Sequence, residues 1–268
     1  MEAASPALMQ QMSEIPYDPK FDPRPKDYFG PIKTNNTVQL PKTVNINFIG
    51  GQKDLDVLAK LIGAPMIGMD SEWRPVISPF DPMRPALLQL SSETDAYLID
   101  LVALAGNKEL DSILTQVFTH SDTLCIGFSF HSDLDMFEQF FPSMSFYKKF
   151  TNFIDVQSYY MKIHELDNQI GLAKVATDLM GKEICKGEQM SNWELRPLRK
   201  TQLHYGALDA YVLIELLKLT AKTAEKKGDI ELAIKPNIEE LTLEGYKQKK
   251  AQQKADRERK HQEKKKAN

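Results

Sequence analysis

The order of the apolar segments along the chain limits its possible folds more than any other feature. Short apolar runs of strand length come first, divided by polar turns; strands then alternate with helices, and only helical spacing remains from Val156 on. This order predicts an α/β fold in which a mixed sheet is flanked by helices. The predicted strands are 45–49, 65–69, 86–90, 96–100, 123–128 and 153–155, and the predicted helices are 55–62, 110–118, 134–141, 156–164, 170–180 and 200–226.

Length and composition exclude several classes of protein. The 268 residues suit one large domain or two small ones. The longest nearly apolar stretch, Leu61 to Met69, is far shorter than the about 20 residues of a membrane-spanning helix, so no membrane association is expected. The first 30 residues lack the pattern of a secretory signal, and the two cysteines form no metal or disulfide framework. We therefore expect a reducing compartment, the cytoplasm or the nucleus.

The two ends of the chain differ from its middle. Residues 1–43 are rich in proline and polar residues and form a predicted arm, which cannot repay its ordering entropy alone but could lie along a folded body. Residues 229–268 form a predicted basic tail, helical or disordered. From Lys247 to Asn268 ten basic residues face three acidic ones, so this segment carries +7 and the rest of the chain −10. The tail can be interpreted as a solvated end or as a segment that binds polyanions, and one does not exclude the other.

Asp70 and Glu72 follow an apolar strand two residues apart, so both side chains lie on one face of it. Two neighbouring carboxylates raise one another's proton affinity, and a divalent cation such as Mg²⁺ or Mn²⁺ removes that cost. The alternative is a solvated strand end.

Two further segments carry isolated acidic groups. Tyr205 and Asp209 lie four residues apart and share one face of a largely apolar helix, where a buried carboxylate needs a cation or a donor. A simple Tyr–Asp contact is the alternative. Asp133 starts a helix after a buried strand, and could instead only complement the helix dipole. Asp135 lies about 200° around that helix and cannot face the same site.

Together these motifs resemble the DEDDy family of 3′–5′ exonucleases, whose three motifs correspond here to Asp70 with Glu72, Asp133, and Tyr205 with Asp209. The resemblance covers roughly 44–224. The segments 87–90, 191–193 and 196–198 and Gln202 resemble the family's second strand and the lead into its third motif. Within the family the chain is most similar to Nibbler and Mut-seven exoribonucleases. The resemblance implies a ribonuclease H-like fold, with a single exonuclease domain over 44–228.

The resemblance also implies a mechanism. Asp70, Glu72, Asp133 and Asp209 would hold two Mg²⁺ or Mn²⁺ ions about 4 Å apart, which activate water and stabilise the leaving oxygen. Asp70 would bridge both ions, Glu72 and Asp209 would complete the shell of the first, and Asp133 would hold the second. Tyr205 would orient the attacking water, since its ordinary pKa near 10 makes it a poor base.

The implied substrate is the 3′ end of single-stranded RNA, and the implied function is metal-dependent trimming of small RNAs, including those presented by a protein partner. Trp73, Arg74 and His131 flank the motifs and are the candidate substrate contacts; a solvated loop charge for Arg74 and a capping role for His131 are the alternatives. A Werner-type DNA exonuclease and a catalytically silent RNA-binding module with the same fold remain open, because sugar choice depends on contacts to the 2′-hydroxyl.

Overall fold

A computed structural model describes residues 36–74, 84–229, 231 and 238–267, and for 260–267 it describes the backbone only. The strands are β1 (Asn45–Ile49), β2 (Met66–Trp73), β3 (Pro85–Ser91), β4 (Asp95–Asp100), β5 (Leu124–Gly127), β6 (Lys149–Asp155) and β7 (Glu239–Thr242). The helices are α2 (Leu55–Leu58), α3 (Lys108–Thr119), α4 (His131–Phe140), α5 (Val156–Ile163), α6 (Leu172–Met180), α7 (Lys200–Lys226) and α9 (Leu243–Ala267). Short 3₁₀ turns span Gln52–Asp54, Ala59–Leu61 and Phe146–Lys148.

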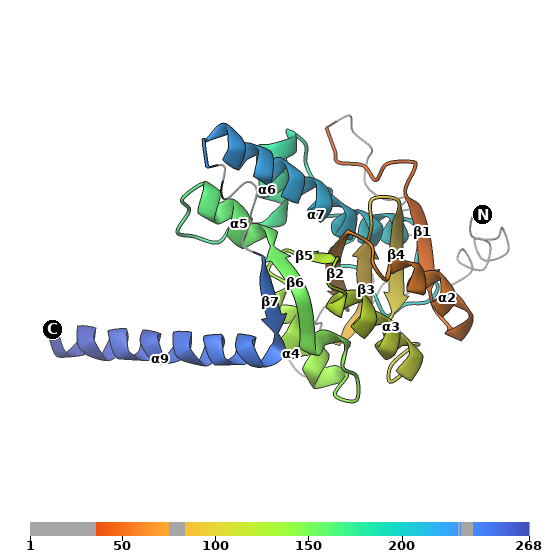
Figure 1. The fold of residues 1–268 in the computed structure, drawn as a ribbon, viewed down its shortest axis with the longest axis horizontal. Helices are drawn as coiled ribbons and strands as arrows, with labels where there is room; N and C mark the ends of the chain where they lie inside the picture. Colours follow the sequence, from red (N-terminus) through yellow and green to blue (C-terminus); the bar gives the residue numbers. More distant parts are fainter. Residues whose placement is uncertain (1–35, 75–83, 230, 232–237, 268) are drawn as a thin grey trace.

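The strands form one mixed sheet in the order β1-β4-β3-β2-β5-β6-β7. β2, β3 and β4 make the predicted antiparallel meander, β1 joins β4 in parallel, and β5 and β6 continue beside β2 in parallel. Helices cover the sheet (Figure 1). The predicted mixed α/β sheet is thus confirmed, and β2 lies at its centre, where both faces are covered.

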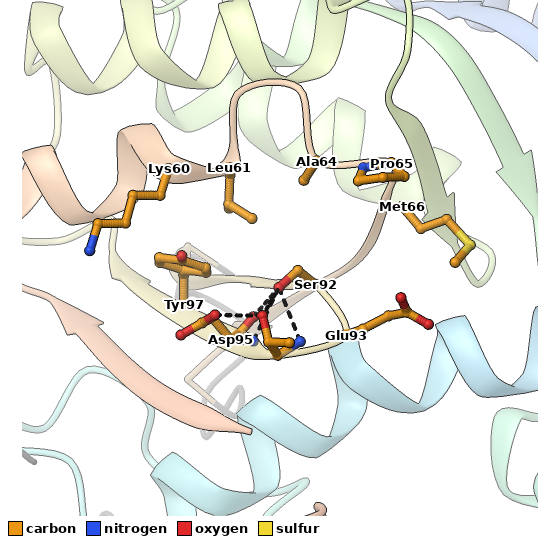
Figure 2. Close-up of a pocket in the computed structure, with 10 residues that line it drawn as sticks. Lys60, Leu61, Ala64, Pro65, Met66, Ser92, Glu93, Asp95 and Tyr97 are labelled. Carbon is orange, nitrogen blue, oxygen red and sulfur yellow. Dashed lines mark hydrogen bonds between the residues drawn. The ribbon is translucent and has the colours of Figure 1, made fainter. Parts of the chain in front are cut away.

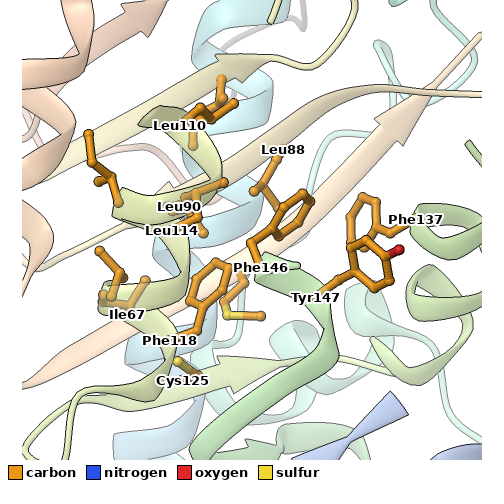
Figure 3. Packing of buried hydrophobic residues seen from close by; sticks show 14 of the residues in the cluster. Ile67, Leu88, Leu90, Leu110, Leu114, Phe118, Cys125, Phe137, Phe146 and Tyr147 are labelled. Carbon is orange, nitrogen blue, oxygen red and sulfur yellow. The ribbon is translucent and has the colours of Figure 1, made fainter. Parts of the chain in front are cut away.

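Each face of the sheet has its own apolar core. On one face, Ile67 and Met69 of β2 pack with α3 and α4, a cluster rich in phenylalanine that includes Phe118 and Phe137 (Figure 3). On the other face, residues of β5 and β6 pack with α5, α6 and α7. Because side chains alternate along a strand, the residues of β2 that do not enter the first core point toward α7.

Helix α7 lies unusually close to β2 because of a glycine. A Cβ placed on Gly68 would come within 1.9 Å of the carbonyl oxygen of Ala210 in α7. Gly206 of α7 likewise allows a close approach to Gln89 of β3, whose amide nitrogen would be 3.1 Å from an added Cβ. These contacts fix the height of α7 above the sheet, and with it the distance between the side chains that the two elements carry.

The prediction that only helices follow Asp155 is wrong at one point. Glu239–Thr242 form β7, which pairs antiparallel with β6 and extends the sheet. The segment contains three polar residues and a single buried apolar one, Leu241, so its sequence lacks the alternation of a half-buried strand. An edge strand needs no such pattern, because its pairing comes from backbone hydrogen bonds.

The ends of the chain are described in part. Most of the predicted arm, residues 1–35, lies outside the described residues, and Thr37 and Val38 pair with Glu183 so that Val38 is buried against the body. Of the predicted tail, 243–267 form the helix α9. No helix in the described ranges combines the length and the apolar character needed to cross a bilayer.

We expect Gly68→Ala to destabilise the protein by about 1–3 kcal/mol, because the new methyl group meets a backbone carbonyl that can move only with the whole of α7. Chemical denaturation monitored by circular dichroism measures this change. Gly171→Ala is the matched control: an added Cβ there meets nothing within 4 Å, and its cost should stay below about 1 kcal/mol. Equal stability of the two variants would contradict the close-approach argument.

Candidate active site

The first motif lies on the part of β2 that faces α7. Gly68 faces Ala210, so Asp70 and Glu72, at the same alternation, also face that helix. Both residues are half-buried, toward the end of the strand. Ser71 between them points to the opposite face and is buried. The shared face that the sequence predicted for the two carboxylates is therefore present.

The third motif lies on α7. Tyr205 and Asp209 are buried, and the Tyr205 hydroxyl donates a side-chain hydrogen bond to the Asp209 carboxylate. The Oδ1 atom of Asp209 is buried and has no hydrogen-bond partner among the described residues. A buried carboxylate oxygen without a donor is costly, so this atom is suited to receive a cation or a water held by one.

The second motif begins α4 after a strained turn. Ser129 adopts a left-handed conformation with φ of 57°, and its backbone N–H donates to Asp155 Oδ2 over 2.6 Å. Asp155 also caps α5 through the N–H of Ser158. Such strain persists only where surrounding contacts hold it, and here it directs the chain from β5 into α4, whose first turn carries Asp133.

Ser71 links the first motif to the second. Its hydroxyl donates a hydrogen bond to Asp133 Oδ1, and both side chains are buried. Sequence reasoning missed this residue, although the strand period gives a signal: the residue between two carboxylates that face α7 must point toward the face that α4 covers.

Electrostatics tie the four carboxylates together. Burial raises the pKa of Asp70 to about 6, and burial together with the charge of Asp70 raises the pKa of Asp133 to about 7. Burial, then the charges of Asp70, Asp209 and Asp133, raise the pKa of Glu72 well above its usual value. Burial and Asp70 do the same to the pKa of Asp209. The sequence-predicted acids thus lie within electrostatic reach of one another.

The same surroundings act on the tyrosine. Burial, and next the charges of Asp209 and Glu72, raise the pKa of Tyr205 far above its usual value. Its hydroxyl therefore stays protonated at neutral pH, and it can donate hydrogen bonds but not accept a proton as a base.

The residues present fit a divalent cation. Hard carboxylate oxygens are the ligands of Mg²⁺ and Mn²⁺, and positive charge would relieve both the mutual repulsion and the unpartnered Asp209 oxygen. Among the described residues, however, no three acidic, histidine or cysteine side chains have their donor atoms gathered around one point.

Each predicted substrate contact stands within two residues of a candidate metal ligand in the chain. Trp73 ends β2 and is half-buried. Arg74 lies 3.6 Å from Glu194, which also accepts from Arg84 over 2.8 Å. In this structure Arg74 is therefore held in an ion pair on the protein itself.

His131 is also placed among acidic groups. Its ring nitrogens lie 3.9 Å from Asp155 and from Glu239, and burial lowers the pKa of His131 while these two acids act in the opposite direction. No substrate contact of Trp73, Arg74 or His131 is tested by this geometry, so those three roles stay predictions.

The segment before α7 holds the third motif in place. Gln202 Nε2 donates to Ser191 Oγ over 2.9 Å, and Arg199 pairs at 2.8 Å with Glu188, which is fully buried. Arg196 Nη2 donates to Asp100 Oδ1 of β4 over 2.7 Å. Glu188 was not singled out in the sequence, where nothing distinguishes it from a surface glutamate.

A separate pocket lies at the other end of the sheet. It has a volume of about 270 Å³ and is lined by the start of β2 and the turn between β3 and β4, including Met66, Glu93 and Tyr97 (Figure 2). None of the candidate catalytic residues lines it, so the carboxylate cluster and this pocket are distinct.

Comparison with known proteins assigns the family. Residues 49–223 match the family model described as 3′-5′ exonuclease. The chain is 33% identical over 175 residues to "Exonuclease mut-7 homolog" of Aedes aegypti, covering 60% of this chain and 24% of that protein. It therefore spans about a quarter of the length of that relative.

Solved structures agree with this match. The crystal structure of the Aedes aegypti Nibbler EXO domain has a TM-score of 0.60 and 26% identity, and covers 71% of this chain and 93% of that one. Escherichia coli RNase D, at 22% identity and a TM-score of 0.56, covers 70% of this chain and 48% of that one, and shares the fold. The chain belongs to the 3′–5′ exonuclease family, in its ribonuclease D-like DEDDy branch, with the expected ribonuclease H-like fold.

Without divalent ions, the raised carboxylate pKa values should make stability fall as pH rises. Asp133 has a pKa of about 7 when folded and an ordinary value of 3.8, so between these values the folded state binds more protons than the unfolded one. The contribution of protonated Asp133 to the free energy of unfolding is fully present below about pH 4 and is lost by about pH 7. Asp133→Asn cannot ionise, so the wild type should lose stability relative to this variant across that window.

Urea denaturation in chelator at a series of pH values measures the difference between the two proteins. Groups remote from Asp133 titrate alike in the two proteins, and the loss of its charge lowers the pKa of Glu72 in the variant, which acts in the same direction. A wild type that gains stability relative to Asp133→Asn between pH 4 and 7 would therefore contradict the assigned direction.

Proposed function

We propose that this protein is a 3′–5′ exoribonuclease that requires Mg²⁺ or Mn²⁺ and hydrolyses single-stranded RNA from its 3′ end. The observation that supports this proposal is that the charges of carboxylates on β2, α4 and α7 raise one another's pKa, together with a buried Asp209 oxygen that has no hydrogen-bond partner among the described residues. Membership of the 3′–5′ exonuclease family supports the same reaction.

Each residue has a proposed part in the reaction. Asp70, Glu72, Asp133 and Asp209 would hold two divalent ions, and their four negative charges match the four positive charges of that pair. Ions bound there supply a nucleophile at neutral pH and stabilise charge on the leaving oxygen. These carboxylates are kept where their repulsion is unrelieved, so they are prepared to accept cations.

Tyr205 would position the attacking water. Its hydroxyl is protonated and anchored to Asp209, which fixes the direction of the phenol ring. At the rim, Trp73 would stack on a terminal base, and Arg74 and His131 would meet phosphates once Arg74 leaves Glu194.

The proposed natural substrates are small RNAs whose 3′ ends are trimmed, including ends presented by a partner protein. This finer proposal rests on the likeness to "Exonuclease mut-7 homolog" and to the Nibbler EXO domain. A DNA exonuclease of the Werner type and a silent binding module are the alternatives. The full set of four carboxylates with Tyr205 favours an active enzyme over the silent module.

Asp209→Asn should lower the hydrolysis rate at least about 100-fold, because a catalytic metal supplies several kcal/mol of transition-state stabilisation and about 1.4 kcal/mol corresponds to each tenfold in rate. The assay follows shortening of labelled RNA and DNA single strands from the 3′ end in Mg²⁺, in Mn²⁺ and in chelator. The substitution keeps the shape of the side chain, so folding should be retained.

Asp122→Asn serves as the matched control, since Asp122 is exposed just before β5, at the end of that strand away from Asp133. It should hydrolyse RNA at the wild-type rate. Faster loss of DNA than of RNA would favour the Werner-type alternative. Decay of neither strand in either metal would favour the silent module and refute the exoribonuclease.

Ser71→Ala should weaken Mn²⁺ binding about 10- to 100-fold, because the hydrogen bond that orients Asp133 is lost. Calorimetric titration of the protein with Mn²⁺ alone gives this value independently of any rate. Ser71→Thr retains a hydroxyl and should recover most of the affinity. Wild-type Mn²⁺ affinity in the alanine variant would show that Ser71 does not position Asp133 for an ion.

A further inference from the structure

Helix α9 is fastened to the body at its start. The Tyr246 hydroxyl and the Lys250 ammonium both donate to Asp135 Oδ2, over 3.0 and 2.5 Å, and Lys247 lies 2.5 Å from Glu138. Asp135 and Glu138 belong to α4, the helix whose first turn carries Asp133. The beginning of α9 is therefore fixed relative to the candidate active site.

An aromatic contact strengthens this connection. The ring of Tyr246 lies with its centroid 5.7 Å from that of His131, and β7, which leads directly into α9, pairs with β6. His131 stands two residues before Asp133 in the same helical turn. The first turn of α9 thus packs on the face of α4 that carries His131 and Asp135, about 200° around that helix from Asp133.

Beyond this anchor the helix leaves the body. The described side chains of 251–259 are exposed except for Asp256, which is half-buried, and Figure 1 shows α9 projecting away from the sheet and the other helices. From Lys247 on, its apolar residues are alanines alone. A helix that is polar all around has no apolar face to bury, so packing against the body does not explain its composition.

The basic residues of α9 form a stripe. Lys247, Lys250, Lys254 and Arg257 follow one another at intervals of three, four and three residues, which places them on one face of the helix. The first two of these make the ion pairs with α4, so the face that meets the body continues outward as the stripe. Among the described side chains, Lys254 and Arg257 have no carboxylate within ion-pairing distance.

The chemistry of the stripe selects its partner. A coiled-coil partner needs apolar residues at regular positions, and a membrane-surface helix needs an apolar face; α9 has neither. A row of cations at intervals of about one helical turn is complementary to the phosphates of a nucleic-acid strand. We propose that the stripe of α9 binds the phosphate backbone of the single-stranded substrate, upstream of the 3′ end held at the carboxylates.

The identity of that strand rests on the proposed function, whereas the binding itself does not require hydrolysis. Phosphate contacts carry no sequence or sugar information, so the stripe should bind RNA and DNA alike. The stripe should increase the affinity for long strands and not for strands so short that they fill only the site at the carboxylates.

The test compares two double variants of the full chain that lose the same charge. Lys254→Gln with Arg257→Gln removes the free part of the stripe, and Lys249→Gln with Arg259→Gln removes two cations from other faces of α9. Glutamine supports helix as well as these residues do, and circular dichroism verifies that α9 is retained. Binding of labelled single strands of roughly 25 and roughly 4 nucleotides, RNA and DNA, is measured by anisotropy in chelator across a salt series.

The stripe variant should bind the long strands roughly tenfold more weakly at about 50 mM salt, and its salt slope should fall by about 1.4, or about 0.7 for each lost contact. The control variant should stay within about twofold of the wild type. Equal losses of affinity in both variants would show that only the total charge of α9 matters, and would overturn the proposal. No loss of affinity in either variant would overturn it as well.

Hydrolysis of the short strand in Mg²⁺ separates this proposal from the proposed function. Both variants should hydrolyse it at the wild-type rate, because neither touches the carboxylates. A chain that binds long strands through the stripe but hydrolyses no strand would contradict the proposed exonuclease activity and support the stripe.

Discussion

Repulsion among four carboxylates is the constraint around which this part of the molecule is arranged. Asp70, Glu72, Asp133 and Asp209 are held where burial and mutual charge raise the pKa of each. An isolated strand or helix could not hold them there, because solvent would separate and screen the charges. The close approach of α7 to β2 at Gly68 imposes the arrangement, and the apolar packing of both sheet faces stabilises it.

Contacts around the carboxylates help to hold them in position. Ser71 orients Asp133 from the reverse face of β2, and the Glu188–Arg199 pair with the Ser191–Gln202 hydrogen bond fixes the start of α7. These contacts restrict the positions available to Asp133 and to the start of α7, as the proposed cation site would need. The family relationship and the electrostatics thus point to the same chemistry.

Sequence reasoning succeeded where patterns are local. Strands β2 to β5 and helices α3, α5 and α7 follow their hydrophobic spacing, and Asp70 and Glu72 share a face because a strand has a period of two. It failed at β7, whose few apolar residues give no strand signal because backbone pairing with β6 alone defines it. Glu188 was overlooked for a related reason: its burial and its partner Arg199 come from chain folding, and no local pattern announces either.

The sequence by itself determined the identities and the local order: four acids and a tyrosine at motif spacings, each on an element whose type its neighbours dictate. Only the tertiary structure decided that these groups lie within electrostatic reach of one another, that Ser71 reaches Asp133 across the sheet, and that α9 starts beside α4 and not elsewhere. The physical reason is that charge coupling and hydrogen bonding depend on distance in space, which is set by packing between segments remote in the chain.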